Sequence, residues 1–323
     1  MPTEQTSQMS EPVFEAATCH KPRLIILIRH GESESNKDKT INQHTPNHQI
    51  PLTENGWKQA RQAGIDLLRV LNLDDYSIVD KLEEQCKEEN GTKKELPLRN
   101  YSPLSKKKDT NVVFYTSPYK RARQTLKGIL NVFDEYNELN CGVKVSEDEK
   151  YHTTGKSKFA LWYPPTFPSG FYENRRRSPV EELSDGKNFL QYRVKDDPRI
   201  REQDFGNFQQ VNSMQDVMKK RSTYGHFFYR FPEGESAADV YDRVASFQET
   251  LYRYFERTNK RPRDAVVLVT HGIYCRVFLM KWFRWTYEEF ESFTNVPNGS
   301  MIVMEFDNST DRYVLRTELP KWC

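Results

Sequence analysis

The chain has 323 residues, and its 48 lysines and arginines against 46 aspartates and glutamates give a net charge of +2. This length is ample for the buried core of one large or two ordinary domains, while a hydrophobic content of 36% leaves part of it for charged tails or insertions. The balanced charge argues against a nucleic-acid-binding protein with a broad basic face, but it allows a local cationic pocket for a small anion.

The N-terminal 22 residues are polar, small and without periodicity, and we expect them to form a disordered tail. The longest apolar runs, at residues 24–28 and 265–269, have five residues each and are too short for a secretion signal or a membrane span. The five cysteines are widely spaced, match no zinc-binding pattern and are expected to be reduced thiols. These features favour a cytoplasmic protein without a transmembrane segment.

The first regular segment predicted in the chain is a buried strand. Residues 24–28 are a continuous run of leucine and isoleucine, which is typical of the central strands of a parallel sheet, and the run ends at Arg29 and His30. Apolar residues then recur every three or four positions from Trp57 to Leu71, and this spacing predicts an amphipathic helix.

The middle of the chain alternates predicted elements with two irregular stretches. Residues 74–110 are charged and are interpreted as a surface insertion to which no structure is assigned. Residues 111–115 predict a second strand, and Pro118 suits the start of a helix whose apolar face continues to Phe133. Residues 140–198 contain several prolines and are predicted to be irregular, as a lid or a flanking subdomain.

The last third of the chain carries the clearest helix signal. Ser236 begins a segment that resembles a capping box, and the apolar stripe after it predicts a helix to Phe255. Residues 265–269 predict another buried strand, residues 273–285 begin an almost wholly apolar helix, and residues 301–306 predict an edge or closing strand. Strands that alternate with helices in this way predict an α/β fold with a mostly parallel sheet.

Two of the buried-type strands each end in a histidine followed by a glycine. These pairs are His30 with Gly31 and His271 with Gly272. Because ligands bind beyond the carboxyl ends of the strands in open α/β sheets, we expect both imidazoles at one site. The glycines allow close approach of a ligand or of neighbouring backbone. Either histidine alone is equally well explained as a satisfied residue at a strand end, whereas two in the same setting favour a functional site.

Arginines accompany both predicted strand ends in the first half of the chain. Arg29 follows five apolar residues directly, so it must emerge into a cleft or be paired, and Arg121 falls on the first turn of the helix after the second strand. A guanidinium group matches the geometry of phosphate oxygens, and a helix N-terminus adds positive potential. We therefore predict a phosphate socket, whereas Lys120, and with less force Arg123, fit a solvated helix face.

Two histidines and two arginines without a metal-ligand set indicate phosphoryl transfer to an imidazole nitrogen. Neutral histidine is a competent nucleophile, and arginines around the phosphoryl oxygens stabilise the charge of the transition state. A leaving alkoxide also needs a proton donor, for which Glu202, just before a turn-prone Phe205-Gly206 pair, is the best candidate. Taken alone, a glutamate beside an arginine is usually only a surface pair.

Two other kinds of site deserve comparison with this one. His44 and His48 have a spacing that could ligate a metal in a hydrolase, but Pro46 between them disfavours the helix that this spacing requires. The lysine run 106–108 and the arginine run 175–177 could bind a polyanion or a membrane surface, although such runs are more often simply solvated.

Six motifs in a fixed order resemble the histidine phosphatase superfamily, in its phosphoglycerate-mutase-like branch. They are RHGES with Asn36 downstream, LTENGWKQA, TSPYKRARQT, REQDFGNF, FPEGES and VTHG. The resemblance extends from residue 23 to about residue 300, and residues 221–243 are similar to the stand-alone broad-range acid phosphatases of that branch. It implies a three-layer α/β/α sandwich formed by a single domain, residues 23–323, with insertions at about 74–110 and 140–198.

The resemblance also implies a role for each matching residue. His30 would be the phosphorylated nucleophile and Glu202 the proton donor, while Arg29, Arg121 and His271 would hold the phosphoryl group. The substrate-binding positions implied are Gly31, Ser33, Asn36 and Gly272. These roles predict a metal-independent acid phosphatase that needs no cofactor and whose partner is a small phosphomonoester, with no role for nucleic acid. The sequence leaves the oligomeric state open.

Other functions stay open at this point. A phosphoglycerate mutase or a sugar-bisphosphate phosphatase would use the same core, and Lys219, Lys220 and Arg221 could hold a second phosphate, although that stretch is more similar to the phosphatases. A non-catalytic phospho-ligand-binding or scaffold protein is a further alternative, against which stands the presence of every expected catalytic residue type. A bifunctional kinase is excluded because the chain contains no P-loop motif.

The proposed chemistry predicts an acidic optimum. His30 must be neutral to attack phosphorus, and Glu202 must be protonated to donate. Nearby arginines favour neutral imidazole and ionised carboxylate, so both groups would be in their working forms together at acidic pH.

Overall fold

The protein is described by a computed structural model that covers residues 21–71, 76–90, 111–141, 171–173, 190–206, 211–257 and 265–322. The predicted tail falls outside this part of the chain except for its last two residues, and so do the basic runs at 106–108 and 175–177. Of the cysteines with described side chains, Cys86 and Cys275 are buried and form no disulfide bond. The assignment of residues 23–323 to one domain stays a prediction.

The regular elements follow one another in the order already suggested by the alternating pattern. The strands are β1 (Leu24–Arg29), β2 (Asn111–Thr116), β3 (Phe171–Glu173), β4 (Gln191–Asp196), β5 (Ala265–Thr270), β6 (Met301–Asp307) and β7 (Arg312–Leu315). The α-helices are α1 (Glu34–Lys37), α2 (Glu54–Val70), α3 (Tyr76–Asn90), α4 (Lys120–Cys141), α5 (Val211–Tyr224), α6 (Ala237–Arg257), α7 (Gly272–Phe283) and α8 (Tyr287–Ser292). Short 3-10 helices η1 (Lys39–Gln43), η2 (Asn47–Gln49) and η6 (Pro198–Ile200) lie in the connections.

Seven strands of the described chain form one sheet in the order β3-β4-β2-β5-β1-β6-β7. The four central strands β4, β2, β5 and β1 are mutually parallel, and β3, β6 and β7 are antiparallel to the strands beside them. The predicted strand at residues 301–306 is therefore not at the edge of the sheet, because β7 pairs with the outer side of β6.

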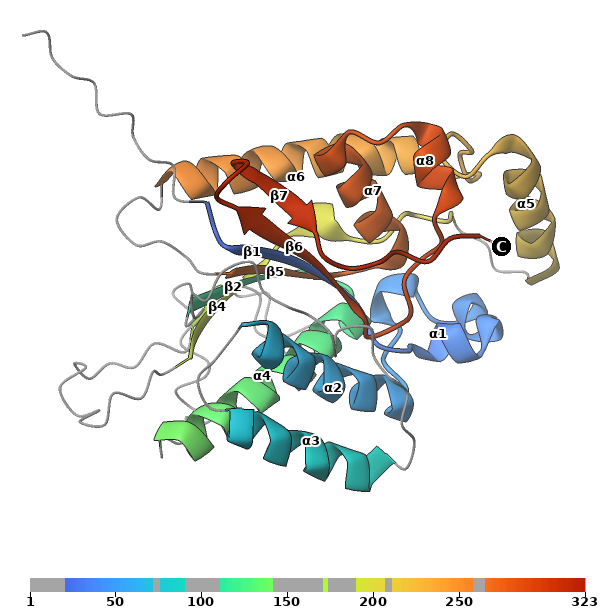
Figure 1. Cartoon of the computed structure of the whole chain (residues 1–323). Coiled ribbons are helices and arrows are strands. Elements are labelled where there is room, and N and C mark those ends of the chain that lie inside the picture. The colour runs from blue at the N-terminus through green and yellow to red at the C-terminus, as the bar shows by residue number, and fades with distance from the viewer. Residues whose placement is uncertain are drawn as a thin grey trace, which may run out of the picture.

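Helices cover both faces of this sheet. Figure 1 shows α2, α3 and α4 on one face and α6, α7 and α8 on the other. Successive side chains of a strand point to opposite faces, so Leu24 and Ile26 of β1 belong to one core and Ile25 and Leu27 to the other. Because β1 is apolar on both faces, it suits only a sheet that is covered on both sides. The predicted three-layer α/β/α sandwich is confirmed.

Both stretches interpreted as insertions contain part of the fold. Residues 74–110 include α3, whose Ile78, Val79 and Leu82 are buried against the helical layer on one face of the sheet. Residues 140–198 include β4, which pairs in parallel with β2 and buries Tyr192 and Val194 on alternate positions. The interpretation of these stretches as wholly irregular was wrong, because a few apolar residues at helix or strand spacing anchor each element within a charged sequence.

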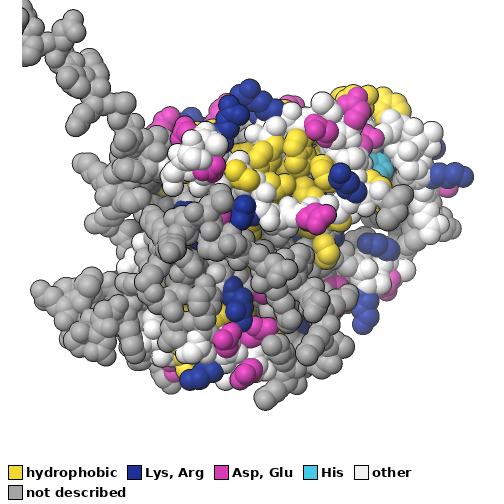
Figure 2. Space-filling view, viewed as in Figure 1, with side chains coloured by type: hydrophobic (Ala, Val, Ile, Leu, Met, Phe, Trp, Pro, Cys, Tyr) yellow, Lys and Arg dark blue, Asp and Glu magenta, His cyan; other side chains and the backbone are white. Residues whose placement is uncertain are grey.

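Hydrophobic side chains are partly exposed at the antiparallel edge of the sheet. Figure 2 shows hydrophobic side chains gathered over β6, β7 and α7, where Trp282, Phe306 and Leu315 are half-buried against the core of that face. In the described part of the chain, no helix is both long and apolar enough to cross a membrane.

The fold places the ends of β1 and β5 side by side. In the parallel register Arg29 lies opposite Thr270, so the residues that follow both strands leave the sheet at the same edge. This edge lies toward α1 and α5, to the right in Figure 1.

A buried ion pair ties β1 to β6 and gives a test of the fold. Arg23 Nη1 lies 2.7 Å from Glu305 Oε1, and both side chains are almost fully buried. Replacing Glu305 by alanine leaves a buried guanidinium without this carboxylate, and we expect a loss of about 3–5 kcal/mol in the free energy of unfolding. Chemical denaturation measures this loss.

The matched control is the exposed pair of Lys21 and Asp311 at the same side of the sheet. Asp311→Asn should change stability by less than about 1 kcal/mol. The double variant Arg23→Met, Glu305→Leu should regain most of the lost stability, because two apolar side chains need no partner charge. A single Glu305→Ala variant as stable as the native chain would contradict this account.

Candidate active site

His30 follows β1, and two hydrogen bonds of its ring define its tautomer. Its backbone N–H donates to the Thr270 carbonyl on the neighbouring strand (2.9 Å). Its ring Nδ1 lies 2.7 Å from the Gly31 carbonyl, which can only accept, so Nδ1 carries the proton. The other ring nitrogen, Nε2, accepts a hydrogen bond from Nε of Arg121 (3.2 Å). The imidazole therefore directs the lone pair of Nε2 toward a guanidinium group.

His271 follows β5 and lies beside His30. The two ring centroids are 5.1 Å apart. His271 occupies the N-cap position of α7, and its Nε2 lies 2.8 Å from the Ser117 hydroxyl. Its Nδ1 is buried and has no hydrogen-bond partner in the part of the chain that the structure describes. The prediction that both imidazoles meet at one site agrees with this geometry.

Both imidazoles are held in the neutral form. Burial, and next the positive charge of Arg121, keep the pKa of His30 well below its usual 6.5. The same two causes keep the pKa of His271 well below 6.5. A neutral imidazole with a free lone pair is a nucleophile, whereas a protonated one is not.

The two predicted arginines lie at this edge of the sheet, each fixed by backbone. Arg121, on the first turn of α4, donates from Nη1 to the carbonyl (2.7 Å) and side-chain oxygen (2.9 Å) of Asn47. Burial lowers its pKa to about 10, so it keeps its charge at neutral pH. Arg29 donates from Nη1 to the Val296 carbonyl, and its Nε is buried without a partner among the described residues.

Glu202 reaches the same site from the segment after η6. It is 8% exposed, and its Oε1 accepts a hydrogen bond from the Gln203 N–H (3.1 Å). Burial lowers the pKa of Arg29 and of Arg121, and the negative charge of Glu202 opposes that lowering in both. The structure thus brings the predicted proton donor to the two arginines.

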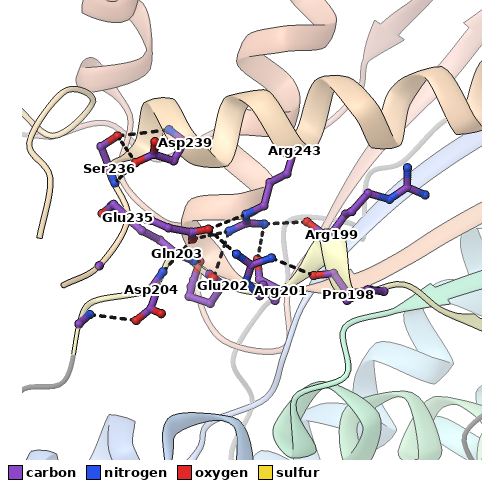
Figure 3. A network of polar contacts seen from close by, with 12 residues as sticks. Pro198, Arg199, Arg201, Glu202, Gln203, Asp204, Glu235, Ser236, Asp239 and Arg243 are labelled. Carbon is purple, nitrogen blue, oxygen red and sulfur yellow. Dashed lines mark hydrogen bonds and ion pairs between the residues drawn. The ribbon is translucent and has the colours of Figure 1, made fainter.

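A network of charged side chains holds the segment that carries Glu202 (Figure 3). Arg243, from α6, donates from Nη1 to the carbonyls of Arg199 (2.7 Å) and Arg201 (2.8 Å), and from Nη2 to the Glu202 carbonyl (3.1 Å). Glu235 accepts hydrogen bonds from Arg243 and Arg201. Three backbone carbonyls and the Glu235 carboxylate therefore fix Arg243, and Arg243 in turn fixes the backbone of Glu202.

The glycines beside the histidines are required by contacts within the chain. A Cβ atom on Gly31 would lie 2.4 Å from the Gly56 carbonyl oxygen, and one on Gly272 would lie 2.8 Å from Cγ of Asn295. Both positions need glycine because neighbouring parts of the protein pack directly against their backbone.

Ser33 and Asn36 order the loop that begins after His30. Ser33 is the N-cap of α1 and donates from its hydroxyl to Oδ1 of Asn36 (2.8 Å). Asn36 Oδ1 also accepts from Nδ2 of Asn298, which donates in addition to the His30 and Gly31 carbonyls. The structure therefore shows a structural use for both predicted substrate-binding side chains.

Several residues of the site did not emerge from the sequence. Ser117 follows β2 and could have been found by the same reasoning as the histidines, because β2 is another parallel strand that ends at this edge. Thr125 accepts the Gly31 N–H (3.0 Å) from within α4. Asn47 lies in the short 3-10 helix η2 and Asn298 in the loop before β6, and no periodic signal marks either of them.

The alternative metal site does not gather ligands in the described structure. His44 caps η1, whereas His48 lies in η2 with its ring 6.4 Å from that of Tyr119. Among the described residues there is no group of three or more His, Cys, Asp or Glu side chains that could hold a metal ion.

Known proteins are similar to this chain in sequence and in fold. Residues 25–77 and 174–318 match the sequence profile of the histidine phosphatase superfamily (branch 1). The chain is 68% identical over 325 residues to the broad-range acid phosphatase DET1 of Saccharomyces cerevisiae, which covers 99% of this chain and 97% of that protein. It is 35% identical to the phosphoglycerate mutase-like protein AT74 of Arabidopsis thaliana, over 90% of this chain and 67% of that protein.

A solved structure of mycobacterial hydrolase 1 matches with a TM-score of 0.50 and 16% identity, covering 93% of this chain and 99% of that one. At this identity the likeness concerns the fold alone. The profile match includes both strand-end histidines and Glu202, and the curated relatives cover nearly the whole chain. This chain belongs to the histidine phosphatase superfamily, branch 1.

Proposed function

We propose that the protein is a metal-independent acid phosphatase that hydrolyses small phosphomonoesters through a phosphohistidine on His30. The observation that carries this proposal is the tautomer of His30, in which the bond from Nδ1 to Gly31 leaves the Nε2 lone pair directed at Arg121. The name of the relative DET1, a broad-range acid phosphatase, supports the same reaction class. A cytoplasmic location is part of the proposal.

In the first step Nε2 of His30 attacks phosphorus, and a nitrogen–phosphorus bond forms as the bond from phosphorus to the leaving oxygen breaks. Glu202 in its acid form donates a proton to that oxygen, so the product leaves as an alcohol. Arg29 and Arg121 stabilise the negative charge on the phosphoryl oxygens. The guanidinium of Arg121 must turn from Nε2 to the phosphoryl group for this step, since it donates to that lone pair in the structure.

In the second step water replaces the imidazole on phosphorus. Glu202, now ionised, takes a proton from the water, the oxygen–phosphorus bond forms and the nitrogen–phosphorus bond breaks. Inorganic phosphate leaves, and both groups return to their starting forms. The protons and bonds balance over the cycle without a cofactor.

The remaining site residues act on the phosphoryl oxygens or on the loops around them. With Ser117 donating to Nε2 of His271, the proton of this neutral ring is on Nδ1, which has no partner among the described residues and is free for a phosphoryl oxygen. We assign Gly31, Ser33, Asn36 and the Gly272 amide to the substrate side of the pocket, as in the family resemblance. Ser33 and Asn36 act there by holding the loop in place.

Removal of the nucleophile is the direct test of this function. His30→Ala should lower kcat for an aryl phosphate by at least about 10³-fold, because no other group can form the covalent intermediate. The native chain should keep its activity with a chelator present, and so should His44→Ala, which removes a histidine of the alternative metal site.

The fate of the phosphoryl group separates the proposal from its alternatives. Release as inorganic phosphate supports a phosphatase, and return to a second position of the substrate would instead support a mutase. Activity that survives in His30→Ala, or that disappears with the chelator, would refute the mechanism.

The lowered pKa of His30 predicts the acid side of the pH profile. A histidine with a pKa of 6.5 would become protonated, and so lose its nucleophilic lone pair, as the pH falls below that value. His30 stays neutral to a clearly lower pH. We therefore expect the acid limb of kcat/KM to lie clearly below pH 6.5, so that activity persists into the acidic range.

Arg121→Gln tests the cause, because loss of its positive charge should move the acid limb of the residual activity upward, toward pH 6.5. Lys120→Gln removes a charge from the same helical turn and should leave the limb in place. An acid limb of the native chain already at pH 6.5 would contradict the lowered pKa of His30.

The network around Glu202 predicts a positioning role for Glu235. Glu235→Gln weakens the hold on Arg243 and Arg201, and the resulting displacement of Glu202 should lower kcat by roughly tenfold to 10²-fold. KM should change less, because the phosphate socket is built from other elements.

The matched control is Arg230→Gln, which removes an exposed ion pair with Asp239 from the same segment. A loss of kcat with KM nearly unchanged in Glu235→Gln, at native thermal stability, identifies positioning of the proton donor. Equal effects of the two variants would contradict it.

A further inference from the structure

Tyr119 is a half-buried aromatic residue at the candidate active site that has no part in the reaction described above. It lies directly before α4, and its carbonyl accepts the Ala122 N–H (3.0 Å) and the Arg123 N–H (3.1 Å) of the first helical turn. The guanidinium carbon of Arg121 lies over the Tyr119 ring, 4.9 Å from its centroid. The ring therefore contacts one of the two arginines that we assign to the phosphoryl group.

Other contacts with the site fix the position of Tyr119. Its backbone N–H donates to Oγ of Ser117 (3.3 Å), and the same hydroxyl is hydrogen-bonded to Nε2 of His271 (2.8 Å). Its ring contacts the His271 ring edge-on, with the two centroids 5.1 Å apart. The ring of His48 in η2 lies 6.4 Å away. The aromatic face that contacts Arg121 is thus held by the same residues as the second imidazole.

The hydrogen bonds of Arg121 do not all persist through the proposed reaction. Nε donates to Nε2 of His30 in the structure, and the attack on phosphorus requires this bond to be given up. The bonds from Nη1 to Asn47 hold only one corner of the guanidinium. The attraction between a cation and the face of a ring acts on the whole charge and not on one N–H. It therefore persists while the guanidinium exchanges one hydrogen-bond partner for another.

The ring attracts the guanidinium without neutralising its charge. Burial raises the pKa of Tyr119 above its usual 10, so the phenol stays neutral at neutral and acidic pH. A carboxylate in the same place would cancel the positive charge that we assign to the transition state, and it would also raise the pKa of His30. A neutral aromatic face avoids both effects.

We infer that Tyr119 is a positioning residue that keeps the Arg121 guanidinium at the site while it turns from Nε2 of His30 to the phosphoryl oxygens. Without the ring, the guanidinium gains orientations that suit neither partner, and substrate binding has to overcome this disorder. The inference rests on the proposed function, because it places the phosphoryl group at His30. The contact is made by the ring, so the role does not require the hydroxyl group.

Substitutions at position 119 test the role of the ring. Tyr119→Leu should lower kcat/KM for an aryl phosphate by about tenfold, whereas Tyr119→Phe should stay within about twofold of the native chain. The inhibition constant of vanadate, whose five-coordinate form resembles the transferring phosphoryl group, should rise by the same factor as kcat/KM falls. Because Tyr119 belongs to neither hydrophobic core, thermal unfolding of both variants should stay close to native.

Fluorinated phenylalanines separate the electrostatics of the ring face from its shape. Each fluorine withdraws electron density from the face and weakens its attraction for a cation, with little change in size. Phenylalanines with one, two and three fluorine atoms at position 119 should therefore give stepwise lower kcat/KM and weaker inhibition by vanadate. This series decides the inference even where Tyr119→Leu fails to fold.

The matched control is Phe306→Leu, which removes an aromatic face beside Lys21 (4.8 Å). Phe306 lies at the opposite end of β6 from Met301, which pairs with the last part of β1 before the site. This variant should leave both kcat/KM and the inhibition constant of vanadate unchanged.

A double variant shows whether Tyr119 acts through Arg121. In the Arg121→Gln background, Tyr119→Leu should change the residual kcat/KM by less than about twofold, because the group that it positions is gone. The full loss in that background would overturn the inference. Native activity in Tyr119→Leu, equal losses in Tyr119→Phe and Tyr119→Leu, or a fluorinated series without a trend would overturn it as well.

Failure of the proposed function is recognised separately. Aryl phosphate hydrolysis that survives in His30→Ala refutes the phosphohistidine mechanism, whatever the variants at position 119 do. Loss of activity in His30→Ala together with native activity in Tyr119→Leu refutes only the positioning role.

Discussion

The parallel pairing of β1 with β5 is the constraint on which the site depends. Its register sets Arg29 opposite Thr270, and the hydrogen bond from the His30 N–H to the Thr270 carbonyl continues the pairing one residue beyond the strand. Two histidines that are remote in the sequence therefore leave the sheet together. A change of register by one residue would point the side chains of the shifted strand to the other face, and Arg29 would no longer lie opposite Thr270.

Burial and positive charge act in the same direction on the pKa values of the two imidazoles. Low exposure and neighbouring arginines both disfavour protonated histidine, which keeps the lone pair of His30 available. The same arginines must be held against their mutual repulsion, and backbone carbonyls of Asn47 and Val296 accept from them for this purpose. Neutral carbonyl groups thus hold the two cationic side chains in the site, so that no carboxylate has to bind these arginines directly.

The sequence predicted the parts of the fold whose signal is local. The apolar runs predicted β1 and β5 correctly, and the apolar stripe predicted α6 correctly. Because the ends of parallel strands meet at one edge of a sheet, the same reasoning placed His30, His271 and Arg121 together. β4 was missed because only Tyr192 and Val194 of its residues face the core, in a charged stretch, and α3 was missed for a similar reason. Asn47, Asn298 and the clamp formed by Glu235 and Arg243 act through loops and distant segments, for which periodicity carries no information. The family was confirmed by comparison, whereas the roles of individual residues stay predictions.

The bond from Arg121 to Nε2 of His30 has a consequence for chemical selectivity. The guanidinium and an incoming electrophile compete for one lone pair, so the nitrogen is masked by a group that only a stronger acceptor can draw away. In the proposed mechanism a phosphate ester supplies that acceptor in its own oxygens, and its binding frees Nε2 of His30 for attack. A neutral acylating or alkylating agent lacks a charged acceptor that could draw the guanidinium away from Nε2. In the proposed mechanism Nε2 of His30 is thereby reserved for anions, and the arginine that protects it from other electrophiles is the one that we propose to stabilise the transition state.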